Sequence, residues 1–309
     1  MPERVLVTGV RGCLGAWTAR ALLDGGHEVV GYDPGDAVHR LQLVLGADLS
    51  RVDVVPGDVA DRGQLERTLD EREITRVVHL AALQVPFCRD DPALGARVNV
   101  LGTVNVFEAV KKRLDRIPGV AYASSAAVYG PADPSPAPES GGLAPATHYG
   151  VFKLANEGNA RVYWQDERVP SIGIRPYVVY GPGRDQGLTS GPTLAMAAAA
   201  RGEAATIGYG GAAQYDYAPD VGRAFARACE AAREGAVVGN YPGAAAAMAD
   251  VVAAIVAAVP DARVDWDDGP LPFPARLQAG VLEEALGGVP RTPLADGVAA
   301  TIERFRTAA

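Results

Sequence analysis

A glycine-rich turn near the start of the chain limits the folds that it can adopt. Val5–Val7 is a short apolar run, and Gly9, Gly12 and Gly15 follow it before a helical pattern begins. In such a turn the first glycine permits the bend, the second lets a pyrophosphate approach the backbone, and the third lets helix and strand pack closely. The N–H groups at the helix N-terminus are available to phosphates. The turn predicts a dinucleotide site; a plain strand–turn–helix of small residues is the alternative interpretation.

The rest of the chain alternates between apolar strand patterns and helical patterns. Strands are expected near residues 4–8, 27–33, 52–56, 76–80, 120–124, 171–175 and 236–240, and helices near 13–24, 61–72, 92–113, 148–167 and 220–233. Such alternation with apolar strands is typical of the α/β class, with a doubly wound parallel sheet of the Rossmann type. Ligands of these sheets bind at the carboxyl ends of the strands.

A second, smaller lobe is expected where the alternation is interrupted. Residues 181–219 and 242–309 contain more Gly, Pro and Ala than the rest. We therefore expect residues 1–180, together with about 220–241, to form the cofactor-binding domain. The two interrupting segments are expected to form an interleaved C-terminal substrate lobe.

Two biased segments carry further expectations. The alanine tracts at 195–200 and 244–247 are expected within short helices. The Pro-rich segment 131–145 can be neither a regular helix nor a central strand. It is expected to be either a flexible loop that borders the active site or a surface linker.

The acid at the end of the second expected strand bears on the choice of cofactor. Asp33 follows the glycines by about 20 residues, where a carboxylate accepts both ribose hydroxyls and repels a 2′-phosphate. This favours NAD over NADP. Two alternatives remain open: Asp33 could cap the turn that follows it, and Arg11 and Arg40 could neutralise a 2′-phosphate.

Tyr149 and Lys153 are spaced for acid–base chemistry. Residues four apart share one face of a helix, so the phenol and the ammonium group can approach the same point. A phenol of ordinary pKa near 10 is a poor base at neutral pH. A neighbouring lysine and an oxidised nicotinamide would lower that pKa, which suits proton exchange with an alcohol during hydride transfer.

These features resemble the extended short-chain dehydrogenase/reductase family, the NAD-dependent epimerase/dehydratase family that includes sugar-nucleotide epimerases and dehydratases. The resemblance covers essentially the whole chain. Its motifs, in the family's order, are Gly9/Gly12/Gly15, Gly57–Val59, His79–Ala82, Asn99, Ser124–Gly130, Tyr149/Lys153, Arg175–Pro182, Leu286–Pro290 and Leu294–Gly297.

The resemblance implies roles for individual residues. The catalytic residues would be Ser125, which binds the substrate oxygen, Tyr149 as the acid–base, and Lys153. The residues that would bind NAD are Gly9, Gly12, Cys13, Leu14, Gly15, Asp33, Asp58, Val59, Leu80, Ala81, Ala82, Asn99, Ser124, Tyr149, Lys153, Pro176 and Val179. Those that would contact substrate are Gln84, Ser125, Ala126, Tyr149 and Val178. A helix cap is the alternative for Ser125, and a solvated side chain is the alternative for Asn99.

Departures from the family pattern bear on the substrate. Sugar-nucleotide epimerases commonly have Asn where this chain has Val178, and an Arg where this chain has alanine in Ala212–Ala213. A buried diphosphate needs charge-assisted donors, so both changes weaken the nucleotide-sugar interpretation. The family's dehydratases have an Asp-Glu pair where this chain has Ala126–Ala127, which argues against dehydration.

Three hypotheses for function follow. The first is an NAD-dependent oxidoreductase that acts on a secondary alcohol or ketone of a sugar-like, sugar-acid-like or polyhydroxylated small molecule. The second is a nucleotide-sugar epimerase, such as a UDP-sugar 4-epimerase, in which Arg184 could bind the diphosphate. The third is a Rossmann-type binding protein without turnover, which the presence of Ser125, Tyr149 and Lys153 argues against.

Composition sets further limits. A net charge of −8 argues against a nucleic-acid or anionic-membrane surface, and the four His residues lack metal-ligand spacing. The three Cys residues are expected to be small buried residues in a reducing compartment. With no signal peptide or apolar run of membrane length, a cytoplasmic protein is expected. The family often pairs two helices from each subunit, so a homodimer through helices 92–113 and 148–167 is expected.

Overall fold

The computed structural model describes residues 2–231 and 234–307. Its strands are β1 Arg4–Thr8, β2 Glu28–Asp33, β3 Val52–Pro56, β4 Arg76–His79, β5 Val120–Ala123, β6 Ser171–Arg175, β7 Val178–Tyr180, β8 Ala204–Ile207, β9 Ala212–Tyr217, β10 Ala236–Asn240, β11 Ala244–Ala247 and β12 Arg263–Trp266. Its α-helices are α1 Cys13–Asp24, α2 His39–Leu45, α3 Arg62–Glu71, α4 Val85–Asp90, α5 Pro92–Ala96, α6 Gly102–Lys111, α7 His148–Glu167, α8 Gly191–Ala200, α9 Ala218–Ala231, α10 Met248–Ala258, α11 Val281–Leu286 and α12 Leu294–Thr307. Short 3₁₀ segments occupy Gly46–Arg51 and Ala126–Val128, and a π-helical turn occupies Arg97–Leu101.

Seven parallel strands form the main sheet, in the order β10-β6-β5-β4-β1-β2-β3. The chain builds outward from β1 to β3, returns to β4 and then builds in the other direction. The expected doubly wound α/β fold is confirmed. Because the strand order reverses beside β1, the sheet has a crevice at the carboxyl ends of β1 and β4, where ligands of such sheets bind.

Two layers of helices cover the sheet. On one face, α1 and α9 pack together and bury Leu22, Val221 and Phe225 against the strands. On the other face, α3, α6 and α7 bury residues such as Leu65 and Phe107. Both faces of the sheet are therefore removed from water, which explains why the strands are continuous apolar runs rather than alternating patterns.

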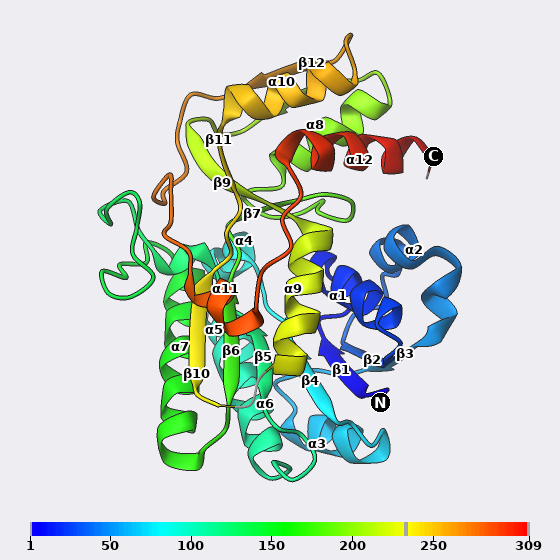
Figure 1. Ribbon diagram of the computed structural model, residues 1–309, viewed down its shortest axis with the longest axis vertical. Helices are drawn as coiled ribbons and strands as arrows, with labels where there is room; N and C mark the ends of the chain where they lie inside the picture. The colour runs from blue at the N-terminus through cyan, green and yellow to red at the C-terminus, as the bar shows by residue number, and fades with distance from the viewer. Residues whose placement is uncertain (1, 232–233, 308–309) are drawn as a thin grey trace.

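A smaller lobe lies beyond the carboxyl ends of the strands (Figure 1). It contains a three-stranded sheet, β11-β9-β7, and a parallel pair, β12-β8, with α8, α10 and α12 packed around a core of their own. The chain passes repeatedly between lobe and sheet, because β10 and α9 join the main sheet while β7 and β9 join the lobe. The expected smaller, interleaved C-terminal lobe is confirmed, and the structure shows that it contains these small sheets.

One expectation about secondary structure was wrong, and another differs from the structure only in detail. The tract Ala244–Ala247 is a strand, β11, antiparallel to β9, and not part of a helix. Alanine has the highest helix propensity, but propensity contributes less than about 1 kcal/mol per residue, and the pairing with β9 overrides it. The helix expected at residues 92–113 is α5, the π-helical turn and α6 in succession. Helix α9 ends at Ala231, and residues 232–233 of the expected helix lie outside the described residues.

The Pro-rich segment is irregular, as expected. Ala137 within it is fully buried, and its N–H and C=O groups bond the backbone of Arg276 and Gln278 in the lobe. The segment contributes no residue to the wall of the main pocket described below. It is therefore attached to the lobe rather than bordering the candidate site. None of the helices in residues 2–231 and 234–307 combines the length and apolar character that crossing a bilayer requires.

Candidate active site

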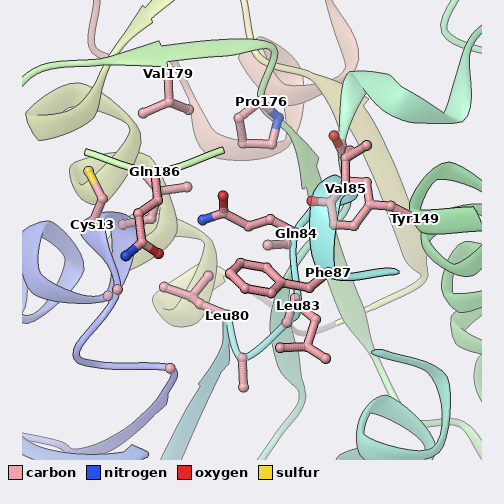
Figure 2. Close-up of a pocket in the computed structure, with 18 of the residues that line it drawn as sticks. Cys13, Leu80, Leu83, Gln84, Val85, Phe87, Tyr149, Pro176, Val179 and Gln186 are labelled. Carbon is pink, nitrogen blue, oxygen red and sulfur yellow. The ribbon is translucent and has the colours of Figure 1, made fainter. Parts of the chain in front are cut away.

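One elongated cavity of about 580 Å³ runs along the carboxyl ends of the strands. Its floor comes from the loops after β1, β2, β4 and β5, and its far wall comes from α7 and from segment 183–189 of the lobe. Figure 2 shows Gln84 projecting across its middle, with Tyr149 on one side and Cys13 and Gln186 on the other. The cavity lies in the crevice that the reversal of strand order creates.

The glycine turn has the geometry of a phosphate cradle. Gly9 adopts a left-handed φ of 70°, and a Cβ there would lie 2.7 Å from the Ala81 nitrogen. A Cβ at Gly15 would collide with the Gly9 carbonyl. Gly12 supplies no side-chain cap to α1, which leaves the N–H groups of that helix end to a phosphate. These residues therefore fit the pyrophosphate of a dinucleotide.

Asp33 lies at the other side of the glycine turn. Its two carboxylate oxygens accept hydrogen bonds from the Arg11 N–H at 3.1 Å and the Gly35 N–H at 3.0 Å. It therefore caps the turn, as the alternative interpretation had it, and it also lines the pocket. Both roles are compatible, because each carboxylate oxygen can accept more than one hydrogen bond.

Helix α7 carries two of the predicted catalytic residues. Thr147 caps the helix by accepting a hydrogen bond from the Gly150 N–H at 3.0 Å, which fixes the first turn and Tyr149 within it. One turn later, Lys153 is buried, and its Nζ donates to the Ala123 carbonyl at 2.6 Å. The Lys153 Nζ lies 5.6 Å from the centre of the Tyr149 ring.

Ser125 completes the group at the end of β5. Its hydroxyl oxygen accepts a hydrogen bond from the Ala127 N–H at 3.1 Å, so it caps the short 3₁₀ turn that follows. Its own proton can be donated to the Tyr149 oxygen or to a substrate oxygen. Ser125, Tyr149 and Lys153 all line the pocket, so the structure brings the predicted catalytic residues together.

Burial dominates the electrostatics of this group. It raises the pKa of Tyr149, while a hydrogen bond with Ser125 and the charge of Arg184 oppose that increase. Burial also lowers the pKa of Lys153 to about 8, against the opposing influence of Cys88 and Glu157. Arg184 lines the same pocket and is therefore a candidate for a cation that favours the phenolate. The predicted effect of Lys153 on the Tyr149 pKa stays a prediction.

Arg184 and Gln84 form the polar part of the wall opposite Tyr149. Arg184 donates from Nη2 to the Thr189 hydroxyl at 3.1 Å, while its buried Nε has no hydrogen-bond partner. The buried Oε1 of Gln84 also has none. Unpartnered buried polar atoms are costly, so both are available to a polar ligand.

Most of the predicted site residues line the cavity, but two do not. Those that do are Gly9, Gly12, Cys13, Leu14, Gly15, Asp33, Asp58, Val59, Leu80, Ala81, Ala82, Gln84, Ser124, Ser125, Ala126, Tyr149, Lys153, Pro176 and Val179. Val178 is fully buried in the core of the lobe, because alternate residues of β7 face opposite sides. Asn99 lies behind the wall, where its amide bonds the N–H and C=O of Leu83 at 2.7 and 2.9 Å. Neither residue therefore lines the pocket, and the structure gives no support for the expected contact of Asn99 with the cofactor or of Val178 with a substrate.

Ser124 differs from its expected role in one respect. It lines the pocket, but its hydroxyl donates to the buried Glu157 carboxylate rather than pointing into the cavity. His79 is packed, as expected, with its ring nitrogens 2.8 Å from the Thr8 hydroxyl and 3.0 Å from the Thr103 hydroxyl. Burial lowers the His79 pKa to about 3, so the ring is neutral.

Several wall residues were missed from sequence. These are Phe87, Tyr177, Asp185, Gln186, Leu188, Thr189 and Phe273. A signal for the lobe segment existed, because Gly181, Gly183 and Gly187 all adopt positive φ angles and such clustered glycines mark a constrained loop. Cys13 is partly exposed in the wall, whereas Cys88 and Cys229 are buried. The residues that the structure describes include no cluster of His, Cys, Asp or Glu that could hold a metal ion.

The sequence profile of the NAD dependent epimerase/dehydratase family matches residues 5–241. The chain belongs to this family. It is 31% identical to a UDP-glucose 4-epimerase of Mycolicibacterium smegmatis over 98% of both chains. It is 35% identical to a D-erythronate dehydrogenase of Cupriavidus necator over 56% of each chain. The structure of a Thermus thermophilus UDP-glucose 4-epimerase in complex with NAD is similar over 99% of this chain and all of that one, with 27% identity and a TM-score of 0.82.

Membership of the epimerase/dehydratase family confirms the resemblance found in the sequence. It makes the chain an enzyme of the extended short-chain dehydrogenase/reductase type, either an epimerase or a dehydrogenase. The hypothesis of a binding protein without turnover is therefore not supported. The relatives include both activities, so family membership does not choose between the two remaining hypotheses.

Proposed function

We propose that the chain is an NAD-dependent oxidoreductase that converts a secondary alcohol to a ketone, or the reverse, on a small polyhydroxylated or sugar-acid-like substrate. The observation that carries the choice of substrate is the shortage of free cations in the pocket. A nucleotide sugar brings a diphosphate with two negative charges, and burying it requires several charge-assisted donors.

Four cations line the cavity among the described residues: Arg11, Arg40, Lys153 and Arg184. Three are engaged, since Arg11 donates to the Asp36 carbonyl, Arg40 pairs with Asp185, and Lys153 donates to the Ala123 carbonyl. Arg11 and Arg184 each keep an unpartnered buried Nε. Arg11 lies beside Asp33, at the end of the pocket proposed to bind the adenosine ribose, so Arg184 is the cation left for a substrate. One guanidinium suits a single carboxylate or a set of hydroxyls better than a diphosphate.

Residues at two further positions support this proposal. Val178 is in the lobe core, and Ala213 in β9 is also buried there. Neither side chain can donate a hydrogen bond. The positions at which the resemblance would place Asn and Arg for a nucleotide diphosphate are therefore apolar in this chain.

The proposed reaction uses three side chains of the pocket. Bound NAD would be held by the glycine turn and Asp33, and its nicotinamide supplies the redox chemistry. Ser125 donates a hydrogen bond to the reacting oxygen of the substrate. Tyr149 takes the proton of that hydroxyl in oxidation and returns it in reduction, while Lys153 and Arg184 supply the positive charge that favours the phenolate.

Turnover with free substrates tests this proposal. The purified protein is incubated with NAD and a panel of sugars, sugar acids, lactones and polyols, and NADH is followed by absorbance. We expect reduction of NAD with at least one substrate that has no nucleotide. Conversion of UDP-glucose to UDP-galactose, with no NADH from any free substrate, would overturn the proposal.

An epimerase is the second candidate, because the similarity to the Mycolicibacterium smegmatis UDP-glucose 4-epimerase extends over 98% of both chains. This function would use the same Ser125, Tyr149 and Lys153, with Arg184 binding the diphosphate. It predicts a cofactor that co-purifies and remains bound through gel filtration. Free exchange of NAD would count against it.

A further inference from the structure

Asp185 links the lobe to the cofactor-binding side of the pocket. Its carboxylate accepts hydrogen bonds from Arg40 Nε at 2.9 Å and Arg40 Nη2 at 2.6 Å, and lies 2.9 Å from His39 Nε2. Arg40 and His39 belong to α2, which follows the turn that begins at Asp33. Arg40, Asp185 and Asp33 all line the cavity. An acid of the lobe therefore holds a cation close to the residue proposed to bind the adenosine ribose.

The backbone around Asp185 packs against the cofactor-binding side of the pocket. The Pro182 carbonyl accepts a hydrogen bond from Trp17 Nε1 at 2.8 Å, and a Cβ at Gly183 would lie 3.8 Å from the Arg40 Cβ. In Figure 1 the green segment after β7 runs over α1 toward α2. The Asp185–Arg40 pair is thus held by its surroundings and is not a chance meeting of two long surface side chains.

The second cation near Asp33, Arg11, is engaged only in part. Arg11 donates from Nη1 to the Asp36 carbonyl at 2.9 Å, and its backbone N–H binds the Asp33 carboxylate. Sequence left open whether Arg11 or Arg40 accommodates a 2′-phosphate. In the structure the Arg40 guanidinium is engaged by Asp185, whereas the Arg11 guanidinium makes one hydrogen bond and keeps an unpartnered buried Nε.

We propose that Asp185 is a determinant of cofactor specificity that acts from the substrate lobe. By engaging Arg40 it removes the cation that a ribose 2′-phosphate would need. This inference rests on the proposed use of NAD. Because Asp185 acts through Arg40, it is a positioning residue rather than a direct ligand of the cofactor.

The environment keeps Asp185 charged. Burial tends to raise its pKa, but hydrogen bonds from Arg40 and His39 outweigh that effect and lower it. The side chain of Arg40 is 15% exposed and that of Asp185 is 37% exposed, so solvent screens the pair only in part. Asp185 therefore remains an effective partner for Arg40 at neutral pH.

The test measures cofactor binding rather than turnover. NADH and NADPH are titrated by fluorescence into the full-length protein and into Asp185→Ala, Arg40→Ala and the double variant. Asp48→Ala is a matched control, since its side chain is 36% exposed and pairs with arginines, yet it lies outside the pocket wall. We expect Asp185→Ala to tighten NADPH binding relative to NADH by roughly 10-fold, the value of one charge-assisted hydrogen bond.

The double variant and the control decide the interpretation. Removing Arg40 as well should return the ratio of the NADH and NADPH dissociation constants to that of the unaltered protein. Asp48→Ala should leave this ratio unchanged. Damage to the fold alone would weaken the binding of both cofactors alike and would leave this ratio unchanged. An unchanged ratio in Asp185→Ala, or a changed ratio that persists without Arg40, would overturn the inference while leaving the use of NAD intact. Absence of NADH binding to the unaltered protein would overturn both.

Discussion

Glu157 lies one helical turn beyond Lys153 on α7, yet it binds Arg175 instead of the lysine. Both guanidinium contacts measure 2.7 Å, and all three side chains are buried. The Ser124 hydroxyl also donates to Glu157, so this carboxylate is fully occupied. Lys153 is left with a neutral carbonyl as its partner, which keeps its charge available to Tyr149 and a cofactor.

Because Lys153 is buried without a carboxylate partner among the described residues, its positive charge lowers the stability of the folded state. Its pKa is about 8 in the native state and 10.5 ordinarily, so the protonated amine is disfavoured by burial. At pH 7, below both values, the folded state bears a cost of about 3 kcal/mol, of which the hydrogen bond to Ala123 would return about 1. We expect Lys153→Met to abolish turnover while raising the free energy of unfolding by about 2 kcal/mol. Urea denaturation measures this, and Lys112→Met, at a half-exposed surface lysine, should change neither property.

Tyr149→Phe separates the proton transfer from cofactor binding. The ring still packs against the wall and only the hydroxyl is lost, so turnover should fall by at least about 10³-fold while NADH affinity changes little. Ser125→Ala should cost about 10²–10³-fold, the value of one preorganised donor. Tyr163→Phe removes a hydroxyl on the same helix, bonded to Glu108 outside the pocket, and should be silent. Near-normal turnover in Tyr149→Phe would refute the proposed role of the phenol.

His79 should make the fold sensitive to acid. Its pKa is about 3 in the folded protein and 6.5 ordinarily, so the unfolded chain binds a proton between these values that the folded chain does not. Stability is therefore expected to fall as the pH drops from 6.5 toward 3, with a contribution of roughly 3 kcal/mol at pH 4. The slope of unfolding free energy against pH should decrease in His79→Gln, but not in the surface variant His148→Gln.

The family resemblance led us to expect a homodimer, and exposed apolar side chains define its surface. Leu94, Leu101, Val151 and Val162 are between 45% and 47% exposed on α5, the π-helical turn and α7, which pack against one another. We expect a dimer of the unaltered protein and a monomer of Leu101→Asp by light scattering after gel filtration. Leu194→Asp, equally exposed but on α8, should remain dimeric. A monomeric unaltered protein at micromolar concentration would contradict the expectation.

The sequence predicted those strands whose position is determined by a local run of apolar residues. The strands at Arg4–Thr8, Val52–Pro56 and Ser171–Arg175 have the expected bounds, because buried parallel strands are continuous apolar runs. Ala244–Ala247 was mistaken for helix, since only its pairing with β9 makes it a strand. Tertiary contact overrode a weak local preference there.

The grouping of the candidate catalytic residues was predictable for a related reason. Ser125, Tyr149 and Lys153 each belong to a short motif next to a strand end or a helix start, and the sheet brings those ends together. The bond between Arg40 and Asp185 joins residues 145 positions apart, and no pattern in either segment signals the other. Partnerships of this kind are created by the lobe and can be read only from the fold.

The repeated passage of the chain between sheet and lobe has a consequence for how such enzymes can change. The last sheet strand, β10, and the covering helix α9 both follow lobe segments in the chain, and α11 returns to pack beside them. A fragment that ends at residue 180 would lack an edge strand and α9, one of the two helices that cover that sheet face. The lobe therefore cannot be exchanged as a cassette, and new substrate preferences have to arise by substitutions within an intact scaffold.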